Sequence, residues 1–251
     1  MGDEGTEEAT RAVDADAALV EGHEPPSARV TLTREKVVDE ALAFLDEVGP
    51  GGLTMRKLGH RLGVEAMSLY TYVPGKEDLL DAIVEALITG LYADPEVLAE
   101  PRNGWQDFLQ RLAHGVRRLA LAHVQAFPLV ASRPPEAPWL RPPLRSVDWV
   151  ESFLSGLIAE GFSDAAAVAA YRAFTSFLLG NLLLEVSTHG ADVGPLDVVE
   201  DTTDTPAALR DAPTVTRLRE GLAEDHAADE FEESLELLLE RITAMKVELA
   251  D

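Results

Sequence analysis

Apolar side chains recur at helical spacing along most of the chain, and no segment alternates apolar and polar residues as a strand would. The first helical segment follows Thr33, a residue type that caps helix N-termini, and stops at the glycine- and proline-rich run 49–52. Its apolar positions are Val37, Val38, Ala41, Leu42, Leu45 and Val48. The same spacing predicts further helices from residue 76 onward and over 104–122, 124–132, 142–160, 163–188 and 229–249. The pattern therefore predicts an all-α fold.

Two very short helical segments, 54–62 and 65–72, follow the first helix and are separated by Gly63. Their apolar positions let them cross at a wide angle if Gly63 adopts the left-handed backbone that such a turn requires. These positions are Leu58, Leu62, Val64, Leu69 and Val73. The sequence therefore predicts a three-helix, helix-turn-helix domain over 31–78 and a larger helical domain over 79–251.

The second short helix leaves small hydroxyls, a thioether and phenols facing outward, flanked by Arg56 and Lys76. These outward residues are Met67, Ser68, Tyr70, Thr71 and Tyr72. Hydroxyls can bond base edges or phosphates, and apolar groups can contact thymine methyls, so the set suits a helix in the DNA major groove. The alternative is two core helices with a solvated face, in which the two tyrosines are ordinary packing residues.

Charge first argues against a nucleic-acid partner, because 45 acidic and 21 basic residues give a net charge of −24. Its distribution reverses that argument locally. In the window 54–76, four basic residues (Arg56, Lys57, Arg61 and Lys76) oppose only Glu65, which leaves +3 there and −27 on the other residues. A basic patch on an acidic protein is consistent with a DNA-binding surface.

Two segments depart from the helical pattern. Residues 1–30 carry eight acidic and two basic side chains with few large apolar groups, which predicts a disordered acidic arm. Residues 190–228 contain three proline-bearing turns, are rich in Asp, Glu and Thr, and predict a long loop with a short helix near 215–222.

The short-helix region resembles the DNA-binding domain of the TetR family of transcriptional repressors. The residues that carry this resemblance are Leu53-Thr54-Met55-Arg56-Lys57-Leu58, Gly63-Val64, Ser68-Leu69-Tyr70 and Gly75-Lys76-Glu77-Asp78-Leu79-Leu80. The resemblance implies DNA contacts by Thr54, Arg56, Met67, Ser68, Tyr70, Thr71, Tyr72 and Lys76. Lys76 also opens a helix whose unpaired N–H groups favour an anion, so it is expected to contact phosphate.

A weaker resemblance, to the tetracycline-repressor type of ligand-binding core, continues into the larger domain. It rests on Trp105-Gln106-Asp107-Phe108-Leu109, Ser132-Arg133-Pro134 and Gly161-Phe162-Ser163, and extends the likeness over about 32–249. Histidines that hold the drug and its magnesium ion in that type of core fall here at Tyr92 and at Leu129 or Val130, and its pocket glutamine falls near Phe153. This departure from the family pattern argues against a magnesium–tetracycline effector, and we expect no cofactor and no metal site.

The remaining pocket candidates are mostly aromatic and predict a small apolar or aromatic effector. They are Trp105, Phe108, His114, Ser132, Trp149, Phe153, Phe174, Phe177 and Asn181. The alternative is that these aromatics simply pack the core and that His114 lies on the surface.

Two helices near the C-terminus carry wide apolar stripes. The positions predicted to pair two subunits are Leu178, Leu182, Leu235, Leu238, Leu239 and Ile242. In the TetR family the corresponding helices form a four-helix dimer interface, which implies a homodimer and a palindromic operator in double-stranded DNA. The alternative is that the stripes close the core of one subunit.

Other classes of protein lack support. The chain has no cysteine, which excludes disulfides, thiolate metal sites and cysteine nucleophiles. It also lacks the zinc-protease, nucleophile-elbow, phosphate-loop and dinucleotide motifs of common enzymes. The stretch 119–132, with 14 residues, is shorter than the roughly 20 that span a membrane, and the N-terminus lacks a secretory pattern. We therefore expect a cytoplasmic, ligand-responsive DNA-binding regulator; the alternative is a helical binding or structural protein that has kept the fold without DNA binding.

Overall fold

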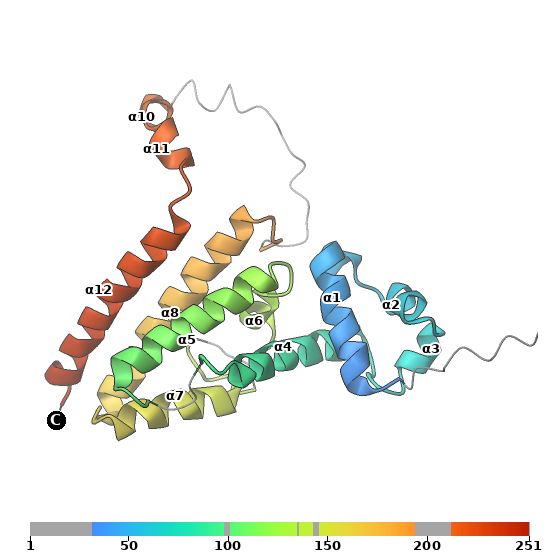
Figure 1. Cartoon of the computed structure of the whole chain (residues 1–251), viewed down its shortest axis with the longest axis horizontal. Coiled ribbons are helices and arrows are strands. Elements are labelled where there is room, and N and C mark those ends of the chain that lie inside the picture. Colours follow the sequence, from blue (N-terminus) through green and yellow to red (C-terminus); the bar gives the residue numbers. More distant parts are fainter. Residues whose placement is uncertain (1–31, 98–100, 135, 143–145, 194–211, 251) are drawn as a thin grey trace, which may run out of the picture. The chain divides into compact units, whose positions relative to one another are not determined.

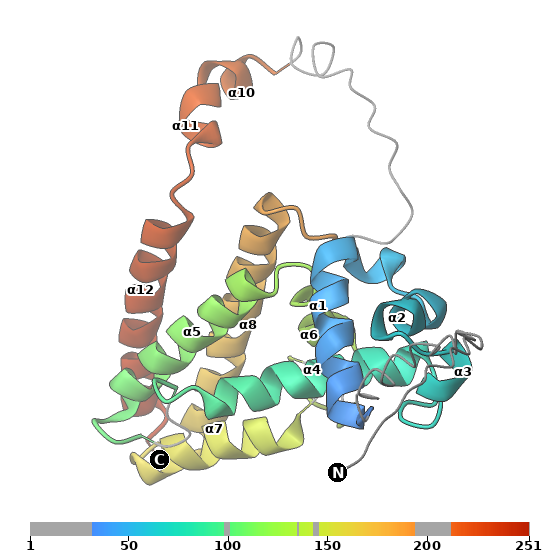
Figure 2. The ribbon, with the colours of Figure 1, turned by 45° about the vertical axis from the view of Figure 1, so that its right-hand side comes forward.

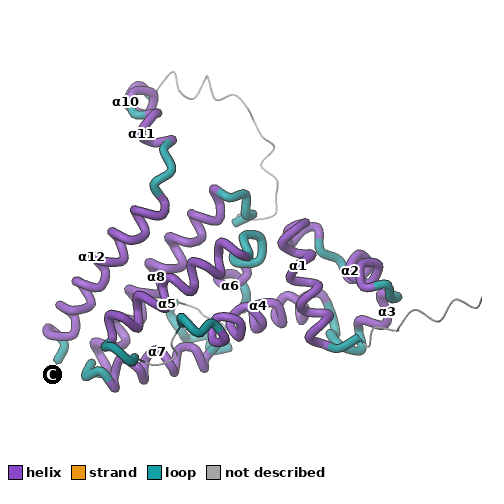
Figure 3. Tube along the Cα trace, in the orientation of Figure 1, coloured by secondary structure: helices purple, strands orange, loops and turns teal. Residues whose placement is uncertain are grey.

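The computed structural model describes residues 32–97, 101–134, 136–142, 146–193 and 212–250, so the predicted acidic arm and the middle of the long loop lie outside it. Helices are the only regular elements of the described residues (Figures 1 and 3), which confirms the all-α prediction. They are α1 (Arg34–Gly52), α2 (Met55–Leu62), α3 (Ala66–Leu69), α4 (Lys76–Ala93), α5 (Trp105–Ala122), α6 (Pro128–Ser132), α7 (Val147–Ala159), α8 (Asp164–Thr188), α10 (Pro213–Arg217), α11 (Arg219–Ala223) and α12 (Ala227–Glu248).

Helix α1 packs against α2 and α4 and begins at its predicted cap. The Thr33 hydroxyl accepts a hydrogen bond from the Lys36 amide at 3.2 Å. Gly49 has φ 70°, so the regular helix breaks where the sequence predicts its end. The contacts among α1 to α4 bury Leu45, Leu58 and Leu69 completely, and this small core holds the two short helices in place.

The turn between α2 and α3 depends on two glycines. Gly63 has φ 69°, the left-handed conformation that glycine adopts without steric cost, and its N–H donates to the His60 carbonyl at 3.2 Å. Gly59 lies on α2 against the backbone of the turn and of the first residue of α3. A Cβ added there would lie 2.9 Å from the Val64 carbonyl oxygen and 3.2 Å from the backbone of Ala66. The absence of a side chain at Gly59 therefore lets α3 lie across α2.

Gly59→Ala is expected to destabilise the helix-turn-helix by about 1–3 kcal/mol, because backbone must move to admit the methyl group. Chemical denaturation would measure the change. Gly90→Ala is the matched control, since nothing lies within 4 Å of the added Cβ in helix α4, and a gain of up to about 1 kcal/mol is expected there. Equal effects of the two substitutions would contradict this account of the turn.

Helix α8 is central to the larger group of helices and packs against α5, α7 and α12 (Figure 2). By length and composition alone it could cross a membrane. Its buried side chains, however, include Phe174 and Leu182, which belong to the same core as Phe108, Phe153 and Phe231 of the neighbouring helices. We therefore describe α8 as the core helix of this group.

Four predicted elements differ from the observed ones in their bounds. The predicted helix 65–72 is reduced to α3, which ends at Leu69, and residues 70–72 form a turn. The predicted helix 124–132 is shortened to α6, because residues 124–127 form turns and Pro128, which has no N–H, stands at the first helical position. The predicted helix 142–160 begins only at Val147, where the Ser146 hydroxyl caps the Trp149 amide at 3.2 Å. Within 190–228, the single predicted short helix is replaced by the short helices α10 and α11.

Candidate nucleic-acid interface and ligand cavity

Helix α3 and the turn 70–72 that follows it present most of the predicted groove-facing side chains to solvent. Leu69 is fully buried and anchors the helix, whereas Met67 is 77% exposed and Tyr70 is 45% exposed. Ser68 and Thr71 are also exposed, and Tyr72 is half-buried. In the alternative, this region only packs a core, and the exposure of the Tyr70 phenol and the Met67 thioether disagrees with that alternative. The surface therefore offers hydroxyl and apolar contacts together.

The basic residues around α3 are less uniformly available than the sequence suggests. Arg61 lies between two carboxylates of α1: its guanidinium donates to Glu47 at 2.5 and 2.7 Å and also to Glu40. The hydrogen bond with Glu47 raises the pKa of Arg61, and in turn Arg61 lowers the pKa of the Glu47 carboxyl. The local excess of +3 therefore overstates the positive charge that this surface offers to DNA, because α1 neutralises Arg61.

Arg56 and the two lysines complete this surface. Within the described chain, Arg56 is exposed and forms no hydrogen bond or ion pair, so its guanidinium is free to bind a ligand. Lys57 Nζ donates to the Gly52 carbonyl at 3.1 Å and Lys76 Nζ to the Pro50 carbonyl at 3.0 Å. Thr54 caps α2 by accepting from the Lys57 amide at 3.3 Å. Each lysine ammonium keeps further N–H groups, so both remain able to meet a phosphate.

A cavity of about 50 Å³ lies among α4, α5, α6, α7 and α8. Its wall is almost entirely apolar, with Ser146 and Thr175 as the polar exceptions. The full lining is Ile88, Leu91, Val116, Leu119, Phe127, Val130, Ser146, Trp149, Thr175, Leu178 and Leu179. An apolar wall with few polar groups is typical of a site for a small organic ligand, and a space of about 50 Å³ requires the wall to move apart before such a ligand enters.

A smaller hollow of about 10 Å³ shares Leu91 and Trp149 with the wall of this cavity. Trp149 stacks on Phe153 with ring centroids 5.5 Å apart. Tyr92 lines the smaller hollow, and partial burial raises the pKa of its phenol, against a smaller opposing effect of Ser152. Trp149 and Leu91 are therefore part of the wall of both spaces.

The structure brings only part of the predicted pocket set together. Phe108, Trp149 and Phe153 line these two spaces. Trp105 packs edge-on against Phe162 at 5.2 Å, and Phe174 is fully buried beside Phe153.

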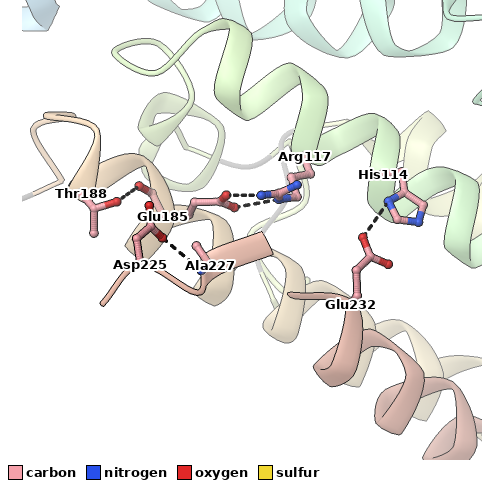
Figure 4. Close-up of polar contacts among 7 residues, drawn as sticks. All are labelled: His114, Arg117, Glu185, Thr188, Asp225, Ala227 and Glu232. Carbon is pink, nitrogen blue, oxygen red and sulfur yellow. Dashed lines mark hydrogen bonds and ion pairs between the residues drawn. The ribbon is translucent and has the colours of Figure 1, made fainter. Parts of the chain in front are cut away.

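The other predicted pocket residues lie away from the cavity wall. Ser132 is exposed, and Phe177 packs on Phe231 of α12. His114 faces Glu232 of α12 at 3.5 Å (Figure 4). Asn181 borders a separate hollow near the start of α12. Sequence spacing missed Thr175, because a lone threonine in an apolar helix carries no signal of the face on which it lies.

The cavity does not offer the donors that a drug-bound magnesium ion needs. No histidine or carboxylate lines it. Tyr92, Val130 and Phe153, which line the two spaces, stand where the resemblance would place the histidines and the glutamine that hold the drug. Among the residues that the structure describes, no group of three His, Asp or Glu side chains could hold a metal ion. The residues present therefore do not fit a magnesium–tetracycline complex.

Residues 123–133 connect the cavity wall to helices α1 and α4. At one end, His123 Nδ1 lies 2.7 Å from an Asp46 carboxylate oxygen of α1. At the other end, Arg133 donates to Glu77 at 2.6 Å and to Asp81 at 2.7 Å, both on α4. Burial acts to lower the pKa of Arg133, but its bonds to these carboxylates outweigh burial and raise it. Phe127 and Val130, between the two ends, line the cavity.

The predicted dimer stripe closes the core of the subunit itself. Leu178, Leu182, Leu235, Leu239 and Ile242 are each at most 7% exposed, and Leu238 is half-buried. The outward-facing leucines of the same helices are instead Leu184, 72% exposed, and Leu237, 66% exposed. The sequence alone could not separate the two faces, because α8 is apolar on most sides.

A buried ion pair ties α5 to α8 beside that stripe (Figure 4). Glu185 is 6% exposed and accepts two hydrogen bonds from Arg117, at 3.0 and 2.5 Å. The Arg117 guanidinium also lies over the Phe231 ring at 5.3 Å. Both charges are thus compensated, and the pair holds the helices that frame the core.

Comparison with known proteins finds likeness over both parts of the chain. The family model for bacterial regulatory proteins of the tetR family matches residues 37–83, and the tetracyclin repressor-like C-terminal domain matches 98–246. The tetracycline repressor protein class D of Escherichia coli is 33% identical over 182 residues, covering 72% of this chain and 78% of that protein.

Solved structures agree with these matches. TetR from Acinetobacter baumannii AYE has a TM-score of 0.64 at 25% identity and covers 86% of this chain and 98% of its own. TetR (class A) in complex with 5a,6-anhydrotetracycline and magnesium has a TM-score of 0.57 at 26% identity, with coverage of 85% and 99%.

Proposed function

The chain belongs to the TetR family of bacterial regulatory proteins, and from this premise we propose that it is a cytoplasmic repressor released from a palindromic operator by a small, largely apolar effector. It is a ligand-responsive, DNA-binding transcriptional regulator that acts as a dimer. Its relatives are transcriptional repressors, and we assign no catalytic role to any residue.

The observation that carries the proposal is the physical connection between the cavity and the DNA-binding helices. Phe127 and Val130 contribute to the cavity wall, and the same short segment contacts α1 through His123 and α4 through Arg133. A ligand that displaces the wall must therefore act on the helices that position α3. Differential affinity of the effector for two arrangements is sufficient to shift the population between them.

In the DNA complex, a two-fold dimer places its two α3 helices about one helical turn of DNA apart or a multiple of it, which requires a palindromic site. We assign Arg56 to a base or a phosphate, and Lys76 to phosphate. Ser68, Tyr70, Thr71 and Tyr72 meet the groove or its walls, Met67 offers apolar contact only, and we count Thr54, the N-cap of α2, among the DNA contacts.

Selection of bound duplexes from a random DNA library at near-physiological salt tests the proposal. The wild-type protein is expected to enrich a palindrome, and a variant with Arg56, Tyr70 and Lys76 all replaced by alanine is expected to enrich none. Failure of the folded wild-type dimer to enrich any sequence would favour the alternative of a helical binding protein that has kept only the fold.

Lys76→Ala is expected to weaken binding to all DNA sequences and to lower the slope of log affinity against log salt by about one for each subunit. The reason is the loss of one phosphate contact. Binding titrations over a range of salt concentrations would measure the slope. Arg61→Ala is the matched control: its guanidinium is held by Glu40 and Glu47, so it should leave the slope unchanged. If Arg61→Ala lowered the slope and Lys76→Ala did not, Arg61 and not Lys76 would be the phosphate contact.

A further inference from the structure

Met67 is the large apolar side chain that the candidate DNA-binding surface exposes most. It lies on α3 and is 77% exposed. The other methionines of the described residues are packed: Met55 is 8% exposed, and Met245 is half-buried against the core of the larger group of helices. A thioether sulfur is only a weak hydrogen-bond acceptor, so Met67 gains little from its contact with water. The exposure of Met67 therefore contributes nothing evident to the stability of the fold.

The direction of Met67 follows from the helical period of α3. Successive side chains of an α-helix are turned by about 100°, so Met67 lies about 160° from Leu69 around the helix axis. Leu69 is fully buried in the core that α1 to α4 share. Ser68 and Tyr70 lie about 100° to either side of Leu69, since the backbone of Tyr70 is still helical, with φ −66° and ψ −13°. Met67 is therefore the side chain that points most directly away from the core.

The major groove offers one kind of apolar partner to such a side chain. Base edges there present hydrogen-bond donors, acceptors and the C5-methyl group of thymine. An apolar side chain pressed against a donor or acceptor displaces its water without replacing the hydrogen bond, which is costly. Against a methyl group, the same side chain removes apolar surface from water, which is favourable. The favourable complement of Met67 in the groove is therefore a thymine methyl group.

We propose that Met67 is a specificity-determining residue that reads a pyrimidine C5-methyl group, so that each half of the operator carries a thymine facing α3. The inference rests on the proposed function and deepens it, because it names a base that the recognition surface selects. Operator affinity then depends on a methyl group that takes no part in base pairing or hydrogen bonding. The unbranched thioether suits this contact, since its three rotatable bonds let it follow the position of the methyl group.

The test replaces the thymines of the selected palindrome by uracil, one symmetric pair of positions at a time. Uracil lacks only the C5-methyl group and keeps every hydrogen-bonding group of thymine. Competition titrations with the full-length dimer give the relative affinities. At one pair of positions, the wild type is expected to bind the uracil duplex roughly 3- to 5-fold less tightly for each half-site, or about 10- to 25-fold for both, the effect of burying one methyl group in each half.

Variants at position 67 assign this effect to the side chain. Met67→Ala should bind the thymine duplex less tightly and lose no further affinity with uracil, whereas Met67→Leu should keep most of the thymine preference. Both variants should unfold at the wild-type Tm, because the side chain is 77% exposed. Val48→Ala is the matched control: it shortens an apolar side chain of α1 that is 40% exposed, and it should keep the full thymine preference.

A second comparison separates the methyl group from the rest of the thymine base. Cytosine and 5-methylcytosine, placed at the same pair of positions, differ from each other only by the C5-methyl group. The wild type should bind the 5-methylcytosine duplex roughly 3- to 5-fold more tightly for each half-site. Met67→Ala should bind the two duplexes equally.

The contrary outcomes separate this inference from the proposed function. Equal wild-type affinity for thymine and uracil at every position, or the same uracil effect in Met67→Ala, would overturn the role of Met67. Enrichment of a palindrome by the same protein would then leave the regulator intact. A selected palindrome without thymine would also overturn the inference alone, whereas no enrichment by the folded wild-type dimer would refute the regulator and this inference together.

Discussion

Arg56→Ala is expected to weaken binding to the selected operator by about 2–6 kcal/mol, because each subunit of the dimer loses one contact of about 1–3 kcal/mol if Arg56 binds a base. The guanidinium is exposed and has no protein partner in the described chain, so its removal leaves no buried group unsatisfied. The fold should therefore be unaffected, with a Tm within the error of the wild type. Competition titrations with the selected palindrome and with a scrambled duplex would measure specific and non-specific affinity separately.

Arg56→Lys is the control that separates a base contact from a phosphate contact. Lysine keeps the charge but cannot form the planar two-bond pair that arginine makes with guanine. If Arg56 reads a base, the lysine variant should lose much of the specific affinity while keeping the non-specific affinity. Full recovery of operator affinity by lysine would assign Arg56 to a phosphate instead.

Arg133→Ala is expected to destabilise the protein by about 2–3 kcal/mol, because it removes charge-assisted hydrogen bonds that join α6 to α4. The Arg133 side chain is 13% exposed and bridges Glu77 and Asp81, so its loss also leaves the half-buried Asp81 carboxylate without this partner. A fall in Tm of roughly 4–10 °C should accompany the change. Hydrogen exchange should report faster opening of α1 to α4 than of α8, since Arg133 holds only the former.

The matched control for Arg133→Ala is Arg34→Ala. Arg34 also pairs with a carboxylate of α4, Glu85, at 3.3 Å, but both side chains are more than half exposed. Water screens such a pair, and its removal should change stability by less than about 1 kcal/mol. Similar losses for the two variants, or uniform exchange across all helices in Arg133→Ala, would show that residues 123–133 do not form a specific link.

Much of the candidate DNA-binding surface follows from local sequence. Thr33 and Thr54 cap the helices that they precede, and Gly63 takes the left-handed turn, because these conformations depend on residues within one helical turn. The exposure of Met67 and Tyr70 follows from the burial of Leu69 between them. Helical period fixes which side chains share a face, so the sequence was sufficient to predict that these two side chains are exposed.

Which arginines are paired with carboxylates of the chain was not predictable in the same way. Arg61 is close in sequence to Arg56, yet it is neutralised by Glu40 and Glu47, which are 21 and 14 positions earlier on another helix. Arg133 finds Glu77 and Asp81 at separations of 56 and 52 positions. With 45 carboxylates in the chain, only packing decides which of them meets a given arginine.

By itself, the sequence determined the all-α class, the two short helices with their glycine turn and the outward face of α3, because each depends on spacing within a few residues. Tertiary structure alone decided which face of the apolar helix α8 closes the core and which lines the cavity. It therefore moved Leu178 and Leu182 from a subunit interface to the interior and placed Thr175 in the wall of the cavity. On a helix that is apolar nearly all round, burial is set by the neighbouring helices and not by periodicity.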